Sequence, residues 1–209
     1  KALQEFTDLV MGFVEKPDSE EPDRKSVRQE LQKFLIGKTS NDNEKNNPFA
    51  INLYLLGYDG NGKLSTLNDA VKQNLKTYLN EYKILTDGVN ISDGFIINIG
   101  IEFEVVTLKN YNKSEVVTEC ISEMKDYFNI NNWTFNNTIN ISELELLLAN
   151  VDGVSSVPKL KIVNKCDGNY SPNSYNIDAA IKDKILYPSL DPSVFEIKFP
   201  DVDIKGRAK

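Results

Sequence analysis

The stretch from residue 95 to 107 constrains the fold more than any other part of the sequence. Its odd positions carry Phe, Ile, Ile, Ile, Phe, Val and Thr, whereas its even positions include Asn98, Gly100, Glu102 and Glu104. Successive side chains of a β-strand point to opposite faces, so this repeat of two residues predicts a strand with one buried face and one polar face. We therefore expect a half-buried strand that lies against a hydrophobic core.

Three segments between residues 66 and 152 have the apolar spacing of amphipathic helices. The first starts at a capping-box pair, Thr66 and Asp69, the second at Asn112, and the third at Asn140 or Ser142. The first two helices are expected to bury apolar stripes, which consist of Leu67, Val71, Leu75, Tyr78, Leu79 and Tyr82 in one and of Val116, Val117, Cys120, Ile121, Met124, Tyr127 and Phe128 in the other.

Apolar or alternating segments at 49–58, 132–139 and 157–163 supply further strands. In the last of them, Leu160 and Ile162 are expected to point inward while the lysines between them point outward. Strands and helices therefore alternate along the chain. This order predicts an α+β fold, in which a small mixed sheet packs with helices.

The sequence divides into three regions. Residues 1–47 are predicted to form a helical arm, with helices at 2–15 and 26–37 and an Asn-rich linker, and residues 48–165 to form the α+β domain. Residues 166–209 are rich in turns and are expected to pack on this domain or on a partner as loops, a short helix and an edge strand. Because the chain starts with Lys inside a helical pattern, we expect it to be a fragment of a longer polypeptide.

The composition argues against several classes of function. The 209-residue chain has 31 acidic and 24 basic side chains, a net charge of −7 and no histidine. The negative charge disfavours nucleic acid as a partner, and no apolar run is long enough to cross a bilayer. Without histidine, Ser-His-Asp and Cys-His nucleophile systems are excluded. We therefore expect a soluble, unsecreted protein that is not an enzyme and has no catalytic residues, no nucleic-acid partner and no membrane insertion.

Metal and cofactor sites are not indicated either. Cys120 and Cys166 form no CxxC motif, and Cys120 lies in a buried helical stripe. The glycine-rich segment after residue 58 fails as a calcium loop, because Lys63 occupies the fifth position counted from Asp59. Its glycine spacing also differs from the dinucleotide fingerprint. We expect a structural turn here, with positive φ at the glycines at positions 60 and 62.

Other groups have a structural interpretation and a weaker functional one. Glu102 and Glu104 share a strand face and could serve a carboxylate hydrolase, but a solvated polar face is the simpler explanation. Trp133 and Phe135 could form a ligand platform, although a core role fits their register with neighbouring apolar residues. A receptor- or carbohydrate-binding module would need exposed aromatics, for which the loosely placed candidates are Tyr54, Tyr58, Tyr170 and Tyr175.

The C-terminal segment "YPSLDPSVFEIKFP" carries more apolar side chains than a loop-rich region is expected to bury. Exposed apolar surface of this kind usually marks a contact between subunits. The candidate subunit interface consists of Tyr187, Leu190, Val194, Phe195, Ile197 and Phe199.

Over residues 48–209 the order of motifs resembles the baseplate J-like family of contractile phage tails and related injection machines. The resemblance rests on "NPFAINLYLLGYD", "GFIINIGIEFEVV", "SEVVTECISEMKDYF", "NNWTFNNTINISELE", "ANVDGVSSVPKLKIV" and "YPSLDPSVFEIKFPDVDIKG". It implies a virion protein of the tail baseplate, made and assembled in the bacterial host cytoplasm. Such a wedge protein pairs with a second copy of itself, binds other baseplate wedge subunits and builds a ring around the hub that rearranges on tail contraction. These motifs are structural signatures and imply no cofactor.

Overall fold

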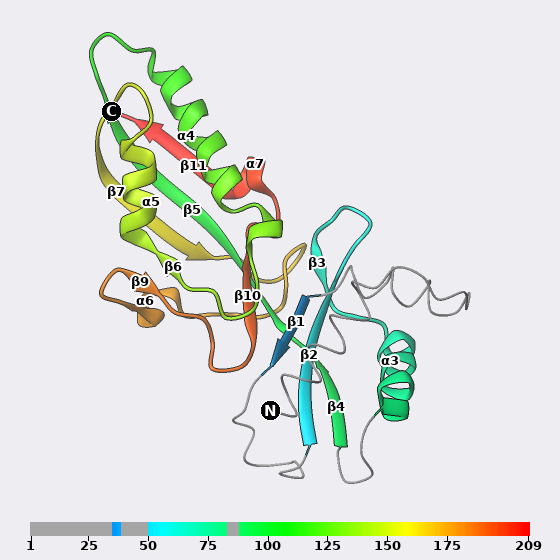
Figure 1. Cartoon of the computed structure of the whole chain (residues 1–209). Helices are drawn as coiled ribbons and strands as arrows, with labels where there is room; N and C mark the ends of the chain where they lie inside the picture. The colour runs from blue at the N-terminus through cyan, green and yellow to red at the C-terminus, as the bar shows by residue number, and fades with distance from the viewer. Residues whose placement is uncertain (1–34, 39–49, 83–87) are drawn as a thin grey trace.

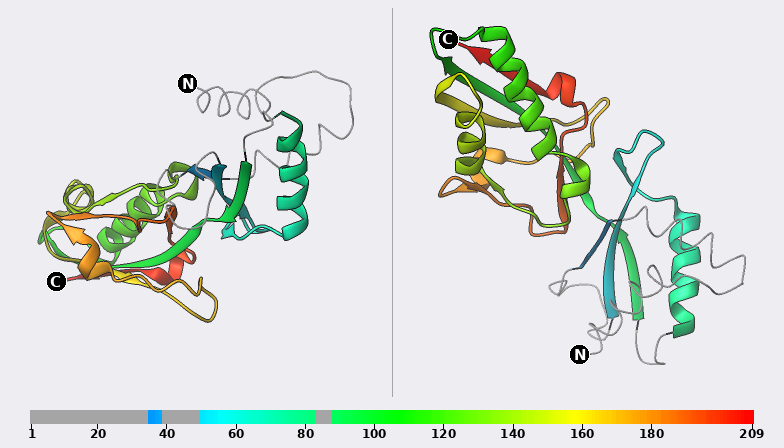
Figure 2. Two further views of the ribbon diagram at one scale, coloured as in Figure 1. Left: turned by 90° about the horizontal axis from the view of Figure 1, so that it is seen from below. Right: turned by 45° about the horizontal axis from the view of Figure 1, so that its top comes forward.

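The computed structural model describes residues 35–38, 50–82 and 88–209 and has an α+β fold. Two main sheets, a smaller one with one helix and a larger one with several helices, lie end to end, and three two-residue strands form a third, minor sheet (Figure 1). Strand β4 leads almost directly into β5, so one extended run of chain passes through both sheets, as both views of Figure 2 show. The expected alternation of strands and helices is present, but the strands belong to separate sheets instead of the single small mixed sheet that was predicted.

The smaller sheet is built around β2, which pairs antiparallel with β1 and β3 and parallel with β4. The helix predicted over 26–37 is wrong at its end, because Leu35 starts a strand that pairs with the edge of β2. The rest of the predicted helical arm, residues 1–34 and 39–47, lies outside the described residues. The elements of this part are β1 (Leu35–Lys38), β2 (Ala50–Tyr58), β3 (Leu64–Ser65), α3 (Asp69–Tyr82) and β4 (Gly88–Asp93).

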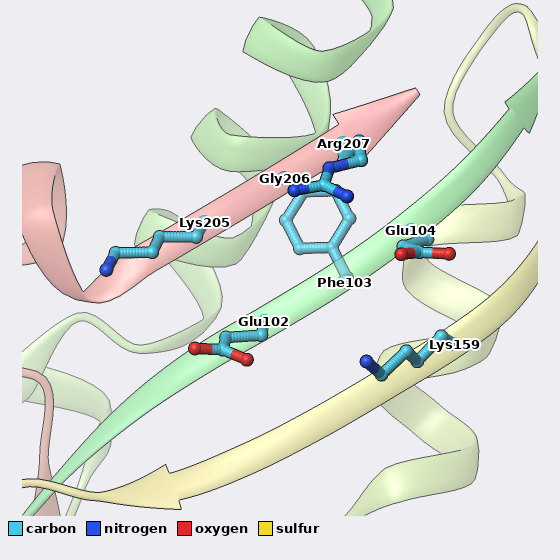
Figure 3. Close-up of a pocket in the computed structure, with 7 residues that line it drawn as sticks. All are labelled: Glu102, Phe103, Glu104, Lys159, Lys205, Gly206 and Arg207. Atoms are coloured by element: carbon cyan, nitrogen blue, oxygen red, sulfur yellow. The ribbon is translucent and has the colours of Figure 1, made fainter. Parts of the chain in front are cut away.

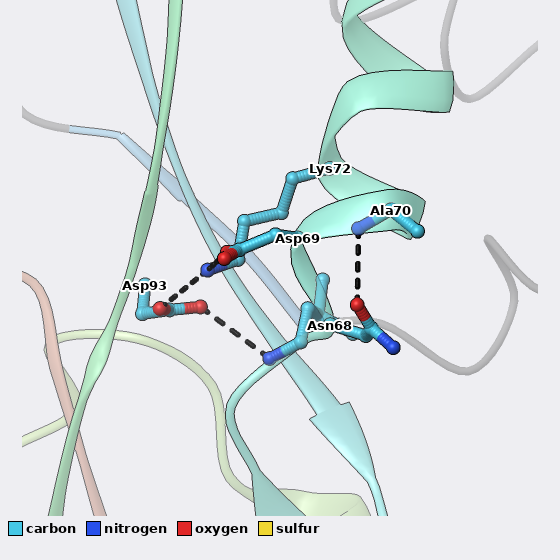
Figure 4. Close-up of polar contacts among 6 residues, drawn as sticks. Asn68, Asp69, Ala70, Lys72 and Asp93 are labelled. Atoms are coloured by element: carbon cyan, nitrogen blue, oxygen red, sulfur yellow. Dashed lines mark hydrogen bonds and ion pairs between the residues drawn. The ribbon is translucent and has the colours of Figure 1, made fainter.

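Helix α3 packs on this sheet through Leu75 and Leu79, as its apolar stripe predicts. Its N-cap differs from the predicted capping box, because the side chain of Asn68 accepts the hydrogen bond from the backbone N–H of Ala70. Lys72 then reaches from the first turn to Asp93 at the end of β4, with 2.6 Å between Nζ and Oδ2 (Figure 4). This ion pair ties the start of the helix to the strand that leads into the larger sheet.

The larger sheet is organised by β5, as the alternating stretch predicts. Strand β7 pairs antiparallel with one edge of its second half, and β11 pairs parallel with the opposite edge. Strand β10 pairs parallel with its first four residues. The main elements are β5 (Phe95–Thr107), α4 (Lys113–Tyr127), α5 (Ile141–Ala149), β7 (Val154–Asn164), β10 (Ser193–Glu196), α7 (Pro200–Asp203) and β11 (Ile204–Ala208).

Helices α4 and α5 cover one face of this sheet, α4 over β11 and α5 over β7 (Figure 1). Asn112 caps α4 and Asn140 caps α5, each by accepting a hydrogen bond from a backbone N–H two residues later. The buried side chains of the two helices, including Met124 and Leu144, join Phe103 of β5 in one core. The predicted one-sided burial of β5 applies only to its second half, since residues 96–101 are buried on both faces.

The strand predicted over 132–139 is wrong except at its end. A short 3-10 helix ends at its first residue, Asn132, and Trp133 turns inward to stack on Phe128 with ring centroids 5.4 Å apart. Its indole N–H also donates to the carbonyl of Tyr127, so the ring is fixed in the core rather than in a strand register. The remaining small elements are η1 (Ile130–Asn132), β6 (Ile139–Asn140), α6 (Ile177–Ala180), β8 (Ile181–Lys182) and β9 (Ile185–Leu186).

Candidate interaction surfaces

The structure divides the six C-terminal candidates into two groups. Val194, Phe195 and Ile197 are buried, with at most 4% of each residue exposed. The reason is that β10, which contains Val194 and Phe195, pairs with β5, and Ile197, directly after β10, joins the same core. Including these three residues in a surface contact was therefore wrong, and a parallel strand pairing with a distant segment could not be read from local spacing.

Tyr187, Leu190 and Phe199 remain exposed, and Leu190 is fully so, at 101% of its reference area. Tyr187 and Leu190 lie in the loop of residues 187–192, which we call the 187–192 loop. Phe199 lies next to α7 and packs its ring edge against Tyr170. The apolar surface of the C-terminal segment is thus concentrated at the 187–192 loop, with a separate exposed ring beside α7.

Hydrogen bonds hold the 187–192 loop at both ends. The hydroxyl of Tyr175 donates to the carbonyl of Tyr187 at 2.8 Å, and the backbone N–H of Ser189 donates to the buried hydroxyl of Ser193 at 3.1 Å. The carbonyl of Pro192 accepts from the N–H at the start of β5 at 2.9 Å. A loop fixed in this way loses little conformational freedom when a partner covers it.

A second surface lies on the face of the larger sheet opposite α4 and α5. The strand register places Lys161 of β7, Glu102 of β5 and Lys205 of β11 side by side. Lys159, Glu104 and Arg207 are side by side in the same way, so each strand carries a row of two charged residues, basic on β7 and β11 and acidic on β5. All of these side chains except Lys161 line a shallow hollow of about 260 Å³, and Figure 3 shows those five around it. We call the six residues, together with Lys209, the basic sheet face.

The electrostatics of this face argue against the hydrolase hypothesis. Lys209 pairs with Glu104 at 2.6 Å and, with Lys159 and Arg207 nearby, holds the pKa of Glu104 below its usual range. A general acid needs the opposite shift, because it must stay protonated near neutral pH. The two glutamates therefore form a central acidic row between the basic residues of β7 and those of β11.

The remaining candidates have structural positions. Segment 58–64 forms the tight β2–β3 connection, where the Asp59 carboxylate accepts hydrogen bonds from the N–H groups of Asn61 and Lys63. Gly62 has the expected positive φ of 73°, whereas Gly60 is not among the positive-φ residues. Cys120 is fully buried, and burial raises its pKa to about 11.

The four tyrosines proposed as an aromatic binding surface do not form one. Tyr54 is buried, and the other three are partly buried. The hydroxyl of Tyr170 donates to Asp203, which raises the pKa of Tyr170 to about 12. The hydroxyl of Tyr175 holds the 187–192 loop. These contacts weaken the receptor- or carbohydrate-binding alternative, since a stacking surface needs exposed rings.

Sequence reasoning missed a buried polar cluster at the junction of the two sheets. Glu196 at the end of β10 is 3% exposed, and its carboxylate accepts hydrogen bonds from the Leu64 N–H and the Asn98 side-chain amide, both at 2.8 Å. The Asn98 oxygen in turn accepts from the Ser171 N–H at 2.7 Å. Burial raises the pKa of Glu196 despite these hydrogen bonds. The cluster clasps the β2–β3 connection to the larger sheet.

Within the described ranges, no group of three or more potential ligand side chains is placed to hold a metal ion, and no helix is long and apolar enough to cross a membrane. No protein-family model matches the sequence, and no curated protein matches it either. The resemblance of residues 48–209 to the baseplate J-like family therefore stays a prediction.

Proposed function

We propose that this chain is a structural, non-catalytic subunit of the baseplate wedge of a contractile phage tail. In this role it associates with a second copy of itself and with other wedge subunits in the ring around the hub. The ring rearranges on tail contraction, and the protein resides in the virion. The sequence resemblance supplies the identity of the assembly.

The observation that supports an assembly role is the 187–192 loop. Leu190 is completely exposed on a backbone that hydrogen bonds hold at both ends. Exposing an apolar side chain to water is unfavourable in the free protein, so its burial by a partner is favourable. Because the loop is already fixed, this burial needs little ordering of the loop. Tyr187, which is exposed in the same loop, belongs to a residue type that is enriched in protein interfaces.

The experiment is co-expression of the chain with the other wedge subunits of its phage, followed by affinity purification and measurement of the bound fraction. Leu190→Asp places a charge in the contact and should reduce recovery of the partner wedge subunits at least about tenfold, which corresponds to about 1.4 kcal/mol. A matched control is Leu108→Asp. Leu108 is also exposed, at 48%, but it directly follows the end of β5, whereas the 187–192 loop is bonded to the start of that strand.

Both variants should remain folded, because neither side chain is buried. Equal recovery of partners by Leu190→Asp, Leu108→Asp and the unchanged chain would contradict a role for the 187–192 loop. Recovery of no wedge subunit and no second copy by the unchanged chain would contradict the proposed function itself. The earlier candidate Phe195 is unsuitable for this purpose, because its substitution would damage the core.

A further inference from the structure

The two sides of the larger sheet with its helices carry opposite excesses of charge. The basic sheet face carries Lys159, Lys161, Lys205, Arg207 and Lys209 against two carboxylates, in a chain whose net charge is −7. Among the described residues, the ion pairs of this face include only the one between Lys209 and Glu104. Most of its cations therefore lack a close anionic partner within the described part of the chain.

The opposite side presents exposed carboxylates on the helical layer. Glu115, Glu119 and Glu123 follow one another at intervals of four along α4, so they lie on one side of the helix. Asp152, in the turn after α5, faces the same region. Two adjoining hollows of about 940 and 330 Å³ are both lined by Glu119 and Asp152. We call these four residues the acidic helix face.

The two faces lie on opposite sides of the sheet. Gly206 of β11 is the register partner of Phe103, and a side chain at Gly206 would meet both the Phe103 ring and Val117 of α4. The side chains one residue away, Glu102 and Glu104, therefore point away from the helices. Rows of basic residues lie on one side of the larger sheet, and a row of acidic residues lies on the other.

We propose that the basic sheet face is a docking surface for the acidic helix face of a second copy of this chain. The contact is heterologous, because it joins two different surfaces, and such contacts repeat head to tail into a ring or a filament. The inference rests on the proposed function and adds to it the surfaces through which copies join. It is separate from the 187–192 loop, which is left for other contacts.

The arrangement of charges favours a protein partner over a nucleic acid. On the basic sheet face two basic rows, roughly 10 Å apart, flank the row formed by Glu102 and Glu104. A uniform polyanion would meet these carboxylates in the middle of the surface. Discrete side chains of another protein can instead contact the basic rows and avoid the acidic one, and complementary charges of this kind determine which surfaces pair.

The test is exchange of charges between the two faces in the full chain. One variant, Lys159→Glu with Lys205→Glu, reverses the sheet face, and a second, Glu119→Lys with Glu123→Lys, reverses the helix face. All four side chains are exposed, and circular dichroism confirms folding. Self-association is measured by sedimentation velocity over a range of concentrations up to about 1 mM, near the weakest affinities of interest.

Each variant alone should associate at least about tenfold more weakly than the unchanged chain. An equimolar mixture of the two should associate again, because each then offers a face complementary to the other. The chain with all four substitutions should self-associate for the same reason. The control Lys76→Glu with Lys182→Glu reverses the same number of exposed lysines away from both faces and should associate much more strongly than the sheet-face variant.

The proposal is overturned if the unchanged chain is monomeric at every concentration, if the two reversals have no more effect than the control, or if neither the mixture nor the fourfold variant recovers. Binding of a DNA duplex that the sheet-face reversal removes, with self-association unchanged, also overturns it in favour of a polyanion site. If these reversals fail while Leu190→Asp still abolishes recovery of wedge subunits, the assembly role stands and the head-to-tail contact alone falls.

Discussion

The polar clasp between the two sheets gives the sharpest prediction, because its hydrogen bonds have a fixed direction. The Asn98 oxygen accepts from Ser171, so its amide group must donate to Glu196. In Glu196→Gln the new amide can keep the bond from Leu64 with its oxygen, but its nitrogen then faces the amide of Asn98. Two donors meet in a buried site, since Asn98 is 1% exposed.

The expected cost follows from the loss of one buried bond to a carboxylate, about 1–3 kcal/mol of unfolding free energy. An opposing effect reduces this cost. Burial disfavours the ionised form of Glu196 and raises its pKa, whereas the neutral amide of glutamine carries no charge that burial could disfavour. The single substitution is therefore expected near the lower end of this range at pH 7.

The matched variant is Asn98→Asp, which alone places a second carboxylate beside Glu196 and should cost more than Glu196→Gln. Combined, the two substitutions exchange donor and acceptor. The new carboxylate at position 98 can then accept from the Ser171 N–H and from the new amide at position 196, which restores the bond in the reverse direction. The double variant should be more stable than Asn98→Asp alone and lie within about 1 kcal/mol of the unchanged chain, with a coupling of about 2 kcal/mol.

The assay is urea unfolding at pH 7, followed by the fluorescence of Trp133, which is the one tryptophan of the sequence and is 5% exposed. The comparison uses midpoints with a common m-value. If Glu196→Gln lies within about 0.3 kcal/mol of the unchanged chain and the double variant is no more stable than Asn98→Asp, the clasp has no such role.

Three other predictions concern the interior. Burial raises the folded-state pKa of Glu196 above 4.5, so the native state binds this proton more tightly than the unfolded chain does. The unfolding free energy of the unchanged chain, relative to that of Glu196→Gln, should therefore rise as the pH falls through the folded pKa toward 4.5. A fall of this relative free energy in urea unfolding would contradict the shift. Gly206→Ala should lower the unfolding free energy by about 1–3 kcal/mol, since its Cβ would lie 2.5 Å from the Phe103 ring and 2.9 Å from Val117. Adding Phe103→Leu to this variant should recover part of the lost free energy in the same urea assay. An unchanged unfolding free energy of Gly206→Ala would refute the packing. With a pKa of about 11, Cys120 should resist iodoacetamide at pH 8 until urea unfolds the protein, as peptide mass spectrometry can follow, and rapid native labelling would contradict its burial.

Local pattern was sufficient for elements that local chemistry defines. The alternation from residue 95 to 107 predicts β5, and Asn112 and Asn140 mark the starts of α4 and α5 because their side chains accept hydrogen bonds from N–H groups two residues later. The α+β fold follows from the order of these elements. The strand prediction at 132–139 was wrong because Trp133 is buried by stacking on Phe128, not by a strand register.

Features that depend on distant pairings could not be predicted. Val194 and Phe195 belong to a turn-rich segment with more apolar side chains than loops usually bury, which suggested that they are exposed. Only the pairing of β10 with β5 buries them. The Glu196 clasp likewise joins positions 132 and 98 residues apart in sequence. The basic sheet face needs the register of three strands, although the alternation of lysines with apolar residues in β7 already places Lys159 and Lys161 on one side.

The most direct measurement of the central claim is quantitative mass spectrometry of purified contractile tails from the phage that the proposed function implies as the source of this chain, with and without its gene. We expect the polypeptide in the baseplate fraction in amounts comparable to the other wedge subunits, and we expect tails that lack the gene to be without an assembled baseplate ring. Absence of the polypeptide from intact baseplates, or normal tails after deletion of the gene, would contradict the account.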